Sequence, residues 1–152
     1  MQTRRDMLAR SASVAAALAG LGLLPQAAQA AWSQAAFEAK NMGELMKALG
    51  TSAPAESKDV SITGPDIAEN GAVVPVGAAT TLAGAKRLLL LVEKNPAMLA
   101  AVFDLSDAVE PAISTRVKMG QSSNVFAVAI TADNKVLYAA KEIKVTLGGC
   151  GG

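Results

Sequence analysis

Apolar and polar residues alternate along most of the chain beyond residue 59, and turn-forming residues separate the alternating segments. The pairs Asn70-Gly71, Asn95-Pro96 and Asp133-Asn134 are the clearest of these turn signals. Short alternating segments with no helical period between them are typical of an antiparallel β-sandwich. We therefore predict an all-β, immunoglobulin-like antiparallel sandwich, with an open barrel as the alternative. The expected strands are residues 60–62, 72–76, 87–92, 98–105, 112–119, 125–131 and 136–147.

Two of the expected strands have an irregular pattern. Pro75 lies inside the strand expected over residues 72–76, and because proline cannot donate to a β-ladder it indicates an edge or a bulged position. Along residues 136–147 the apolar positions are first even-numbered and then odd-numbered, with the change between Ala140 and Ile143. We predict a β-bulge at this change of phase.

Before the expected sandwich, apolar residues recur every three or four positions between Trp32 and Leu49, which places them on one face of a helix. Ser33 is suited to cap the start of this helix and Gly50 to cap its end. We predict an N-terminal helix over residues 32–49, followed by a linker over residues 51–59. We interpret its apolar face as packing against the sandwich or a partner, rather than as a cofactor site. The residues of this face are Trp32, Ala36, Ala39, Met42, Met46 and Leu49.

Residues 1–30 have the features of an export signal. Arg4 and Arg5 form a twin-arginine pair, an apolar stretch follows over residues 14–24, and Ala28-Gln29-Ala30 supplies a small-x-small cleavage site. The apolar stretch is shorter than the roughly 20 residues that a membrane-spanning helix needs. We therefore predict a Tat-type signal peptide, a periplasmic location, and a mature protein without a membrane span, whose folded domain covers residues 31–147.

The composition excludes several kinds of chemistry. The chain of 152 residues contains one cysteine and no histidine, which excludes a Ser-His-Asp triad, an imidazole metal site, a CxxC redox pair and an internal disulfide. A net charge of +1 gives no broad electrostatic footprint for nucleic acid. Carboxylate chemistry is not excluded, but we interpret the acidic cluster of Asp104, Asp107 and Glu110 as a solvated turn. We expect no catalytic residue, no cofactor and no metal.

The single cysteine, Cys150, lies in a run of glycines, and glycine has the greatest backbone freedom and no side chain to pack. We predict that residues 148–152 form a mobile arm, which places the thiol up to roughly 10 Å beyond Leu147. Nothing nearby in the sequence would activate this thiol as an enzyme activates its nucleophile. The arm therefore suits a carrier, which holds a substrate covalently on Cys150 and presents it to other enzymes. The glycines of the arm are Gly148, Gly149, Gly151 and Gly152.

The chain contains the stretches PDIAENG (residues 65–71), VPV (74–76), KMGQSS (118–123), YAAKEIKV (138–145) and VTLGGCGG (145–152). These stretches resemble the SoxY family, the sulfur-carrier subunit of the bacterial Sox thiosulfate-oxidising system. The resemblance implies an immunoglobulin-like sandwich, a heterodimer with a smaller SoxZ-like subunit, and thiosulfate-derived sulfur bound covalently at Cys150. It also implies that the haem enzyme SoxAX conjugates thiosulfate to Cys150, that the di-manganese hydrolase SoxB releases sulfate, and that the molybdenum enzyme SoxCD oxidises the remaining sulfur.

The residues alone leave three other interpretations open. The chain could be a thiol-dependent sulfurtransferase that uses Cys150 as its own nucleophile. It could carry sulfur on a Gly-Gly carboxylate at Gly152, as a ubiquitin-like carrier does. It could also be an immunoglobulin-like interaction module whose cysteine only forms an intermolecular disulfide.

Overall fold

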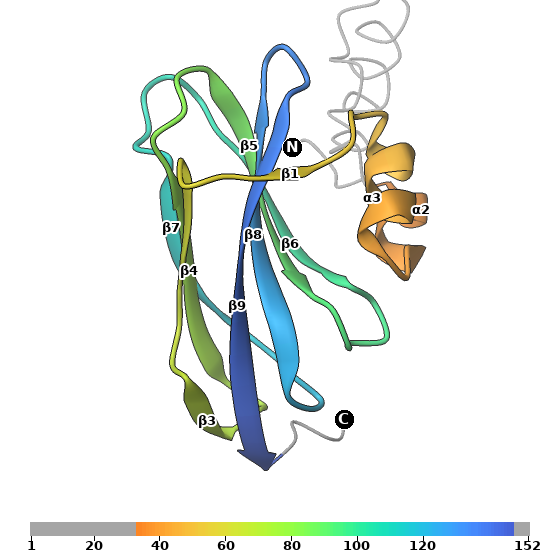
Figure 1. The fold of residues 1–152 in the computed structure, drawn as a ribbon, viewed down its shortest axis with the longest axis vertical. Helices are drawn as coiled ribbons and strands as arrows, with labels where there is room; N and C mark the ends of the chain where they lie inside the picture. Colours follow the sequence, from red (N-terminus) through yellow and green to blue (C-terminus); the bar gives the residue numbers. More distant parts are fainter. Residues whose placement is uncertain (1–32, 148–152) are drawn as a thin grey trace, which may run out of the picture. The chain divides into compact units, whose positions relative to one another are not determined.

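Two β-sheets pack face to face in the computed structural model, which describes residues 33–147 (Figure 1). The strands are β1 (Ala55–Glu56), β2 (Val60–Thr63), β3 (Ile67–Asn70), β4 (Val74–Thr80), β5 (Ala85–Val92), β6 (Leu99–Asp104), β7 (Ala112–Val117), β8 (Ser123–Thr131) and β9 (Val136–Leu147). The larger sheet has the order β1-β9-β8-β5-β6, with β3 also paired to β9, and the smaller sheet has the order β2-β4-β7. This architecture confirms the predicted all-β sandwich.

Strand β5 is buried on both of its faces. Leu88 and Leu90 belong to the cluster in the sandwich interior, whereas Leu89 and Leu91 belong to a second cluster between the larger sheet and the helices. All four side chains are fully buried. In a strand that is covered on both faces, consecutive residues are apolar, and apolar and polar residues do not alternate. This explains the sequence of residues 87–92. Burial of one leucine side chain is worth roughly 1.5–3 kcal/mol, so both layers contribute to stability.

Strand β9 pairs with β8 in continuous register from Val136 to Ile143, so the predicted bulge in this strand is wrong. The early even-numbered residues, such as Tyr138, contact the cluster under the helices, and the odd-numbered residues, beginning with Leu137, contact the sandwich interior. The helices cover only the first part of the strand, and Ala140 is already exposed. The change of phase in the sequence therefore marks the end of the helix-covered region.

The predicted helix over residues 32–49 is two helices, α2 (Gln34–Glu38) and α3 (Met42–Leu49). The break occurs because Asn41 starts a new helix. Its side-chain oxygen accepts a hydrogen bond of 2.9 Å from the Glu44 N–H. The Glu44 carboxylate accepts another of 2.9 Å from the Lys40 N–H. This reciprocal arrangement is close to a capping box, and it interrupts the helix that the apolar period predicts.

The outer caps and the packing of the two helices follow the prediction. The Ser33 hydroxyl caps α2 by accepting a hydrogen bond of 3.3 Å from the Ala36 N–H, and Gly50 ends α3 in the left-handed conformation, at a φ of 66°. Met46 is buried against the larger sheet, and Met42 and Leu49 are partly buried in the same cluster. The apolar face therefore packs on the sandwich.

Two short strands that the sequence pattern does not predict, β1 and β3, pair with β9 in parallel. Ala55 of β1 lies opposite Leu137 near the start of β9, and Ala68 of β3 lies opposite Val145 near its end. Strand β1 belongs to the segment predicted as a linker. Strand β1 has only two residues, and β3 has the sequence Ile-Ala-Glu-Asn, in which the apolar residues are adjacent rather than alternating. Neither strand therefore has a signature in the sequence.

Pro75 lies in a part of β4 that is paired on one side only. Strand β7 pairs with β4 from Val74 to Ala79, whereas β2 pairs only with residues 77–80. Pro75 therefore has no ladder partner on the side of β2, where its missing N–H costs no hydrogen bond. Of the two predicted alternatives, the edge position applies to this part of β4 only, since β4 is the central strand of its sheet and its pairing with β7 shows no bulge.

Candidate functional site

The predicted carrier residue Cys150 and its glycines Gly148, Gly149, Gly151 and Gly152 lie outside the described residues. The structure instead describes the part of the sandwich from which they continue. This region, the arm base, consists of residues 144–147 at the end of β9, strand β3, and the turn over residues 70–73. In Figure 1, β3 lies beside the end of β9.

Strand β3 holds one side of the arm base through backbone hydrogen bonds. The Lys144 N–H donates to the Asp66 carbonyl over 3.0 Å, and the Gly71 N–H donates to the Leu147 carbonyl over 2.8 Å. The Thr146 hydroxyl adds a bond of 3.1 Å to the Glu69 carbonyl. The last residue of β9 is therefore fixed to a turn that lies more than seventy residues earlier in the sequence.

The connection between β7 and β8 holds the other side of the arm base. The Ser122 hydroxyl accepts a hydrogen bond of 2.8 Å from the Val145 N–H, and the Met119 N–H donates one of 2.7 Å to the Gly71 carbonyl. Met119 is itself fully buried. The sequence pattern alone predicts only a turn here, although this segment belongs to the KMGQSS stretch that resembles the SoxY family. The two sets of bonds give residues 148–152 a rigid point of attachment.

An ion pair lies beside the arm base. The Lys141 ammonium is 2.9 Å from the Asp66 carboxylate. The hydrogen bond and the positive charge of Lys141 lower the pKa of Asp66 below its ordinary value. Because the Asp66 side chain is 90% exposed, water screens the pair, and its effect on stability is small.

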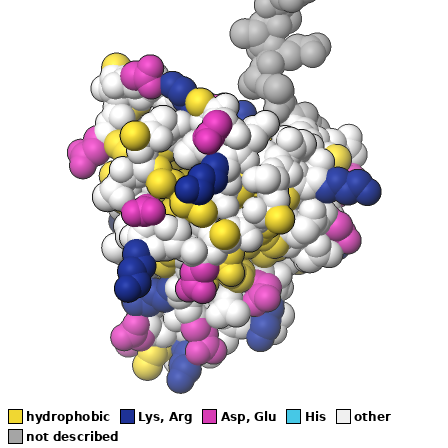
Figure 2. Space-filling model, turned by 45° about the horizontal axis from the view of Figure 1, so that its top comes forward, with side chains coloured by type: hydrophobic (Ala, Val, Ile, Leu, Met, Phe, Trp, Pro, Cys, Tyr) yellow, Lys and Arg dark blue, Asp and Glu magenta, His cyan; other side chains and the backbone are white. Residues whose placement is uncertain are grey.

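Large apolar side chains are exposed around the arm base. Within residues 33–147, four large apolar side chains are strongly exposed, and three of them (Ile67, Val73 and Leu147) belong to the arm base. The fourth, Val109, lies in the connection between β6 and β7. Elsewhere the surface is mixed, and Figure 2 shows acidic and basic side chains interspersed on one face. Three of the four most exposed large apolar side chains of residues 33–147 therefore lie at the arm base. Hydrophobic side chains are also visible between the charged ones in Figure 2.

The acidic cluster singled out in the sequence forms ion pairs rather than a metal site. Asp104 lies 2.6 Å from Arg87, and Asp107 lies 2.6 Å from Lys86, which lowers the pKa of Asp107 through its hydrogen bond and charge. Glu110 is exposed in the same connection. Among residues 33–147 there is no group of three acidic, histidine or cysteine side chains that could hold a metal ion. Asp107 and Glu110 are exposed in the turn that follows β6, which supports the interpretation of this segment as a solvated turn.

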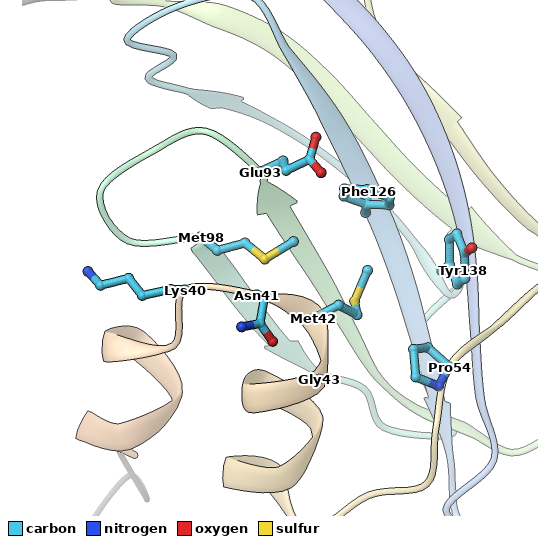
Figure 3. Close-up of a pocket in the computed structure, with 9 residues that line it drawn as sticks. All are labelled: Lys40, Asn41, Met42, Gly43, Pro54, Glu93, Met98, Phe126 and Tyr138. Carbon is cyan, nitrogen blue, oxygen red and sulfur yellow. The ribbon is translucent and has the colours of Figure 1, made fainter.

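A pocket of about 460 Å³ lies between the helices and the larger sheet. The side chains of Met42, Met98, Phe126 and Tyr138 point into it, whereas the Lys40 ammonium points away (Figure 3) and donates a hydrogen bond of 2.7 Å to the Pro96 carbonyl. The rings of Phe126 and Tyr138 pack edge to face, with centroids 5.8 Å apart.

This pocket is too far from the arm base to receive Cys150. Tyr138 and Leu147 are separated by nine residues of the continuous strand β9, a distance of roughly 30 Å. The three residues from Leu147 to Cys150 span only about 10 Å. The site to which the sequence points is therefore the arm base, not the pocket.

None of the helices in the described part of the chain is long and apolar enough to cross a membrane.

Comparison with known proteins identifies the family. None of the curated proteins matches the chain, but residues 45–150 match the model of the family described as "Sulfur oxidation protein SoxY". The sulfur carrier protein SoxY from Chlorobium limicola f thiosulfatophilum has a similar structure, with a TM-score of 0.62 and 32% identity over 69% of this chain and 94% of that chain. A variant of the superoxide reductase (neelaredoxin) from Ignicoccus hospitalis shares the fold alone, with a TM-score of 0.51 and 18% identity over 57% of this chain and 78% of that chain. Because the family match spans most of the chain and extends to Cys150, the chain belongs to the SoxY family.

Proposed function

We propose that this protein is a sulfur carrier of thiosulfate oxidation, which holds sulfur intermediates covalently on Cys150 and presents them to partner enzymes. The observation that carries the proposal is the family match, whose last matched residue is Cys150 itself. The similar structure from Chlorobium limicola is also a sulfur carrier protein. In this proposal the chain is a substrate of its partners rather than an enzyme.

The loading step joins the Cys150 thiolate to the outer sulfur of thiosulfate. Formation of this S–S bond removes two electrons, which a SoxAX-like haem enzyme accepts, and gives a cysteine S-thiosulfonate. A SoxB-like hydrolase then adds water to the terminal sulfonate, which releases sulfate and two protons and leaves a persulfide on Cys150. A SoxCD-like enzyme, where the host has one, accepts six electrons from the outer sulfur of the persulfide, which takes its oxygen atoms from three waters, releases six protons and becomes a cysteine S-sulfonate. Each step takes place in an active site that the partner supplies.

The arm base supports this role by fixing the end of β9 from which residues 148–152 continue. Backbone bonds from β3 and a hydroxyl bond from Ser122 fix the end of β9. Beyond Leu147, glycines without side chains allow residues 148–152 to enter a narrow channel. The cargo therefore stays tethered between steps, and its local concentration at each enzyme is high.

The proposal also includes a periplasmic location and a heterodimer with a SoxZ-like subunit. Residues 1–30 serve as a Tat-type signal that directs the protein to the periplasm, and the domain over residues 31–147 pairs with a SoxZ-like subunit. The Tat route transports folded proteins, so the heterodimer crosses the membrane already assembled. Residues 148–152 form the carrier arm.

The proposal is tested by reconstitution with purified proteins. The complex of this chain with its SoxZ-like subunit is incubated with thiosulfate, with and without a SoxAX-like enzyme and an electron acceptor, and the peptide that contains Cys150 is analysed by mass spectrometry. We expect a thiosulfonate adduct only when the enzyme is present, and no adduct on Cys150→Ser. Turnover of thiosulfate and cyanide by the chain alone would instead show a sulfurtransferase.

A further inference from the structure

Three exposed apolar side chains, which we call the apolar collar, lie around the point where residues 148–152 leave the sandwich. They are Ile67, Val73 and Leu147, with exposed fractions of 58%, 54% and 67%. Clustered apolar side chains on a protein surface commonly mark a binding site, whereas isolated ones need no explanation.

Backbone pairing places the three residues at the same end of the sandwich. Leu147 lies opposite Asn70, whose carbonyl accepts a hydrogen bond from the Val73 N–H. Ile67 lies opposite Lys144, three residues before Leu147 on β9, so its side chain is on the outer face of the sheet, whereas Leu147 is on the face of the sandwich interior. The three residues therefore share one end of the sandwich but do not form one continuous patch. The collar is thus built on the same strand and turn that fix the arm base.

The exposure of Leu147 is not explained by packing within the domain. Leu147 continues the odd-numbered row of Ile143 and Val145, which faces the sandwich interior. Ile143 is fully buried and Val145 partly buried, but Leu147 extends past the end of the core. Leu147 is therefore apolar although its side chain contributes little to the sandwich core.

The fourth exposed apolar residue, Val109, lies at the opposite end of the sandwich. Its connection is attached to the far end of β4, where the Thr80 N–H donates to the Pro111 carbonyl. Strand β4 is seven residues long and begins next to Val73, so about 20 Å of strand separates the two ends. In Figure 1, β3 and the connection from β6 to β7 lie at opposite ends of the sandwich. Val109 is therefore a control with the same exposure and a different location.

The short distance from Leu147 to Cys150 requires any partner enzyme to contact the arm base. Three residues span at most about 10 Å, so the reacting group of the enzyme must come within that distance of Leu147. The surface around the enzyme's entrance then lies against the collar. Glu69, Lys118 and Lys144 are exposed close by and supply the polar rim that commonly surrounds an apolar interface.

We propose that the apolar collar is the docking surface for the enzyme that loads Cys150, and that the entrance of this enzyme's channel is lined by apolar side chains no more than about 10 Å from its reacting group. This inference rests on the proposed function, because it needs an enzyme that acts on Cys150. It adds the surface through which that enzyme recognises the carrier.

The test compares Val73→Asp with Val109→Asp in the full complex, using the SoxAX-like enzyme and thiosulfate as above. We expect kcat/KM for the loading of Cys150 to fall about tenfold in Val73→Asp, a loss typical of a charge placed in an interface centre. Val109→Asp should load like the unchanged protein, and Val73→Ile should keep most of the activity. Alkylation of Cys150 by iodoacetamide should proceed equally in all variants, which shows that the thiol remains accessible.

Three results would overturn the docking proposal. One is equal loading of Val73→Asp and Val109→Asp. Another is loss of the SoxZ-like subunit from Val73→Asp during purification, which would assign the collar to the subunit interface. The third is a change in the molar mass of Val73→Asp by light scattering, which would assign it to self-association. If the unchanged protein is never loaded, the proposed function itself fails, so the two failures are distinguishable.

Discussion

The Gly71 N–H donates a hydrogen bond of 2.8 Å to the carbonyl of Leu147. It joins the turn after β3 to the last described residue of β9, from which the segment with Cys150 continues. Cys150, the proposed carrier residue, thus follows a point that the long-range pairing of the sandwich holds in place. The predictions below test this attachment, the layers that support it, and the chemistry at its end.

Removal of the Ser122 hydroxyl should weaken the arm base. In Ser122→Ala the partly buried Val145 N–H loses its side-chain acceptor at 2.8 Å, and an unsatisfied buried donor costs about 1–3 kcal/mol. Urea unfolding should show a lower midpoint with an unchanged slope. Ser61→Ala is the matched control, because the exposed Ser61 hydroxyl makes only a bond of 3.4 Å. Equal midpoints for the two variants would show that Ser122 does not stabilise the arm base.

Leucines on the two faces of β5 should be equally sensitive to truncation. Leu89→Ala leaves a cavity under the helices, and Leu90→Ala leaves one in the sandwich interior, since both side chains are fully buried. Each should lower the free energy of unfolding by about 2–5 kcal/mol. The exposed Val109 should tolerate alanine within about 0.5 kcal/mol. A small effect of Leu89→Ala alone would mean that the helices do not cover this face.

Asn41→Ala distinguishes two helices from one continuous helix. With Asn41 as the cap of α3, its loss should cost about 1 kcal/mol. Inside a continuous helix the same substitution would be stabilising, because alanine is the better helix former. Thermal unfolding gives the sign of the effect, and Asn41→Ser should preserve most of the stability because serine is also a good cap.

The ion pair beside the arm base should be visible in a pH titration. Lys141 holds the pKa of Asp66 below its ordinary value, so the small stabilisation from this pair is present above the unfolded pKa of about 4. It is lost as the pH falls through the folded pKa. In Lys141→Met, carboxyl NMR should show the pKa of Asp66 rising. The pKa of Asp107, which is lowered by Lys86 instead, should stay unchanged. An unchanged pKa for Asp66 in this variant would contradict the pairing.

Most strands can be predicted because the signals for them lie within the strand itself and the turns beside it. Alternation of period two and dipeptides such as Asn70-Gly71 identify strands and turns without reference to the rest of the chain. The change from even-numbered to odd-numbered apolar residues in β9 is wrongly predicted as a bulge. It arises because the helices cover only the first part of this strand, and the sequence alone does not show which part of a strand is covered. The prediction of a single helix is wrong because the spacing of apolar residues continues unchanged across Asn41, where the second helix begins. The spacing of Asn41 and Glu44, which is that of a capping box, is the signal for this break.

The candidate site is predicted only in part, for the same reason. Cys150 is identified by its glycine neighbours and by a resemblance, both of which are visible in the sequence. The residues that fix its base are not, because Gly71 and Ser122 act through bonds to β9 from distant segments. Strand β3 is also not predicted, because its apolar residues Ile67 and Ala68 are adjacent and do not alternate with polar ones. The apolar collar becomes visible only when the pairing of β3 with β9 brings Ile67 and Leu147 to one end of the sandwich.

The most direct test of the carrier function is intact-mass analysis of this protein isolated from cells supplied with thiosulfate. The carrier account predicts adducts of thiosulfonate or additional sulfur atoms on the peptide that contains Cys150, which a reductant removes. The Cys150→Ser protein from the same cells should have no such adducts. A thiol that stays unmodified while the cells oxidise thiosulfate, or adducts located on Gly152 rather than Cys150, would contradict the account.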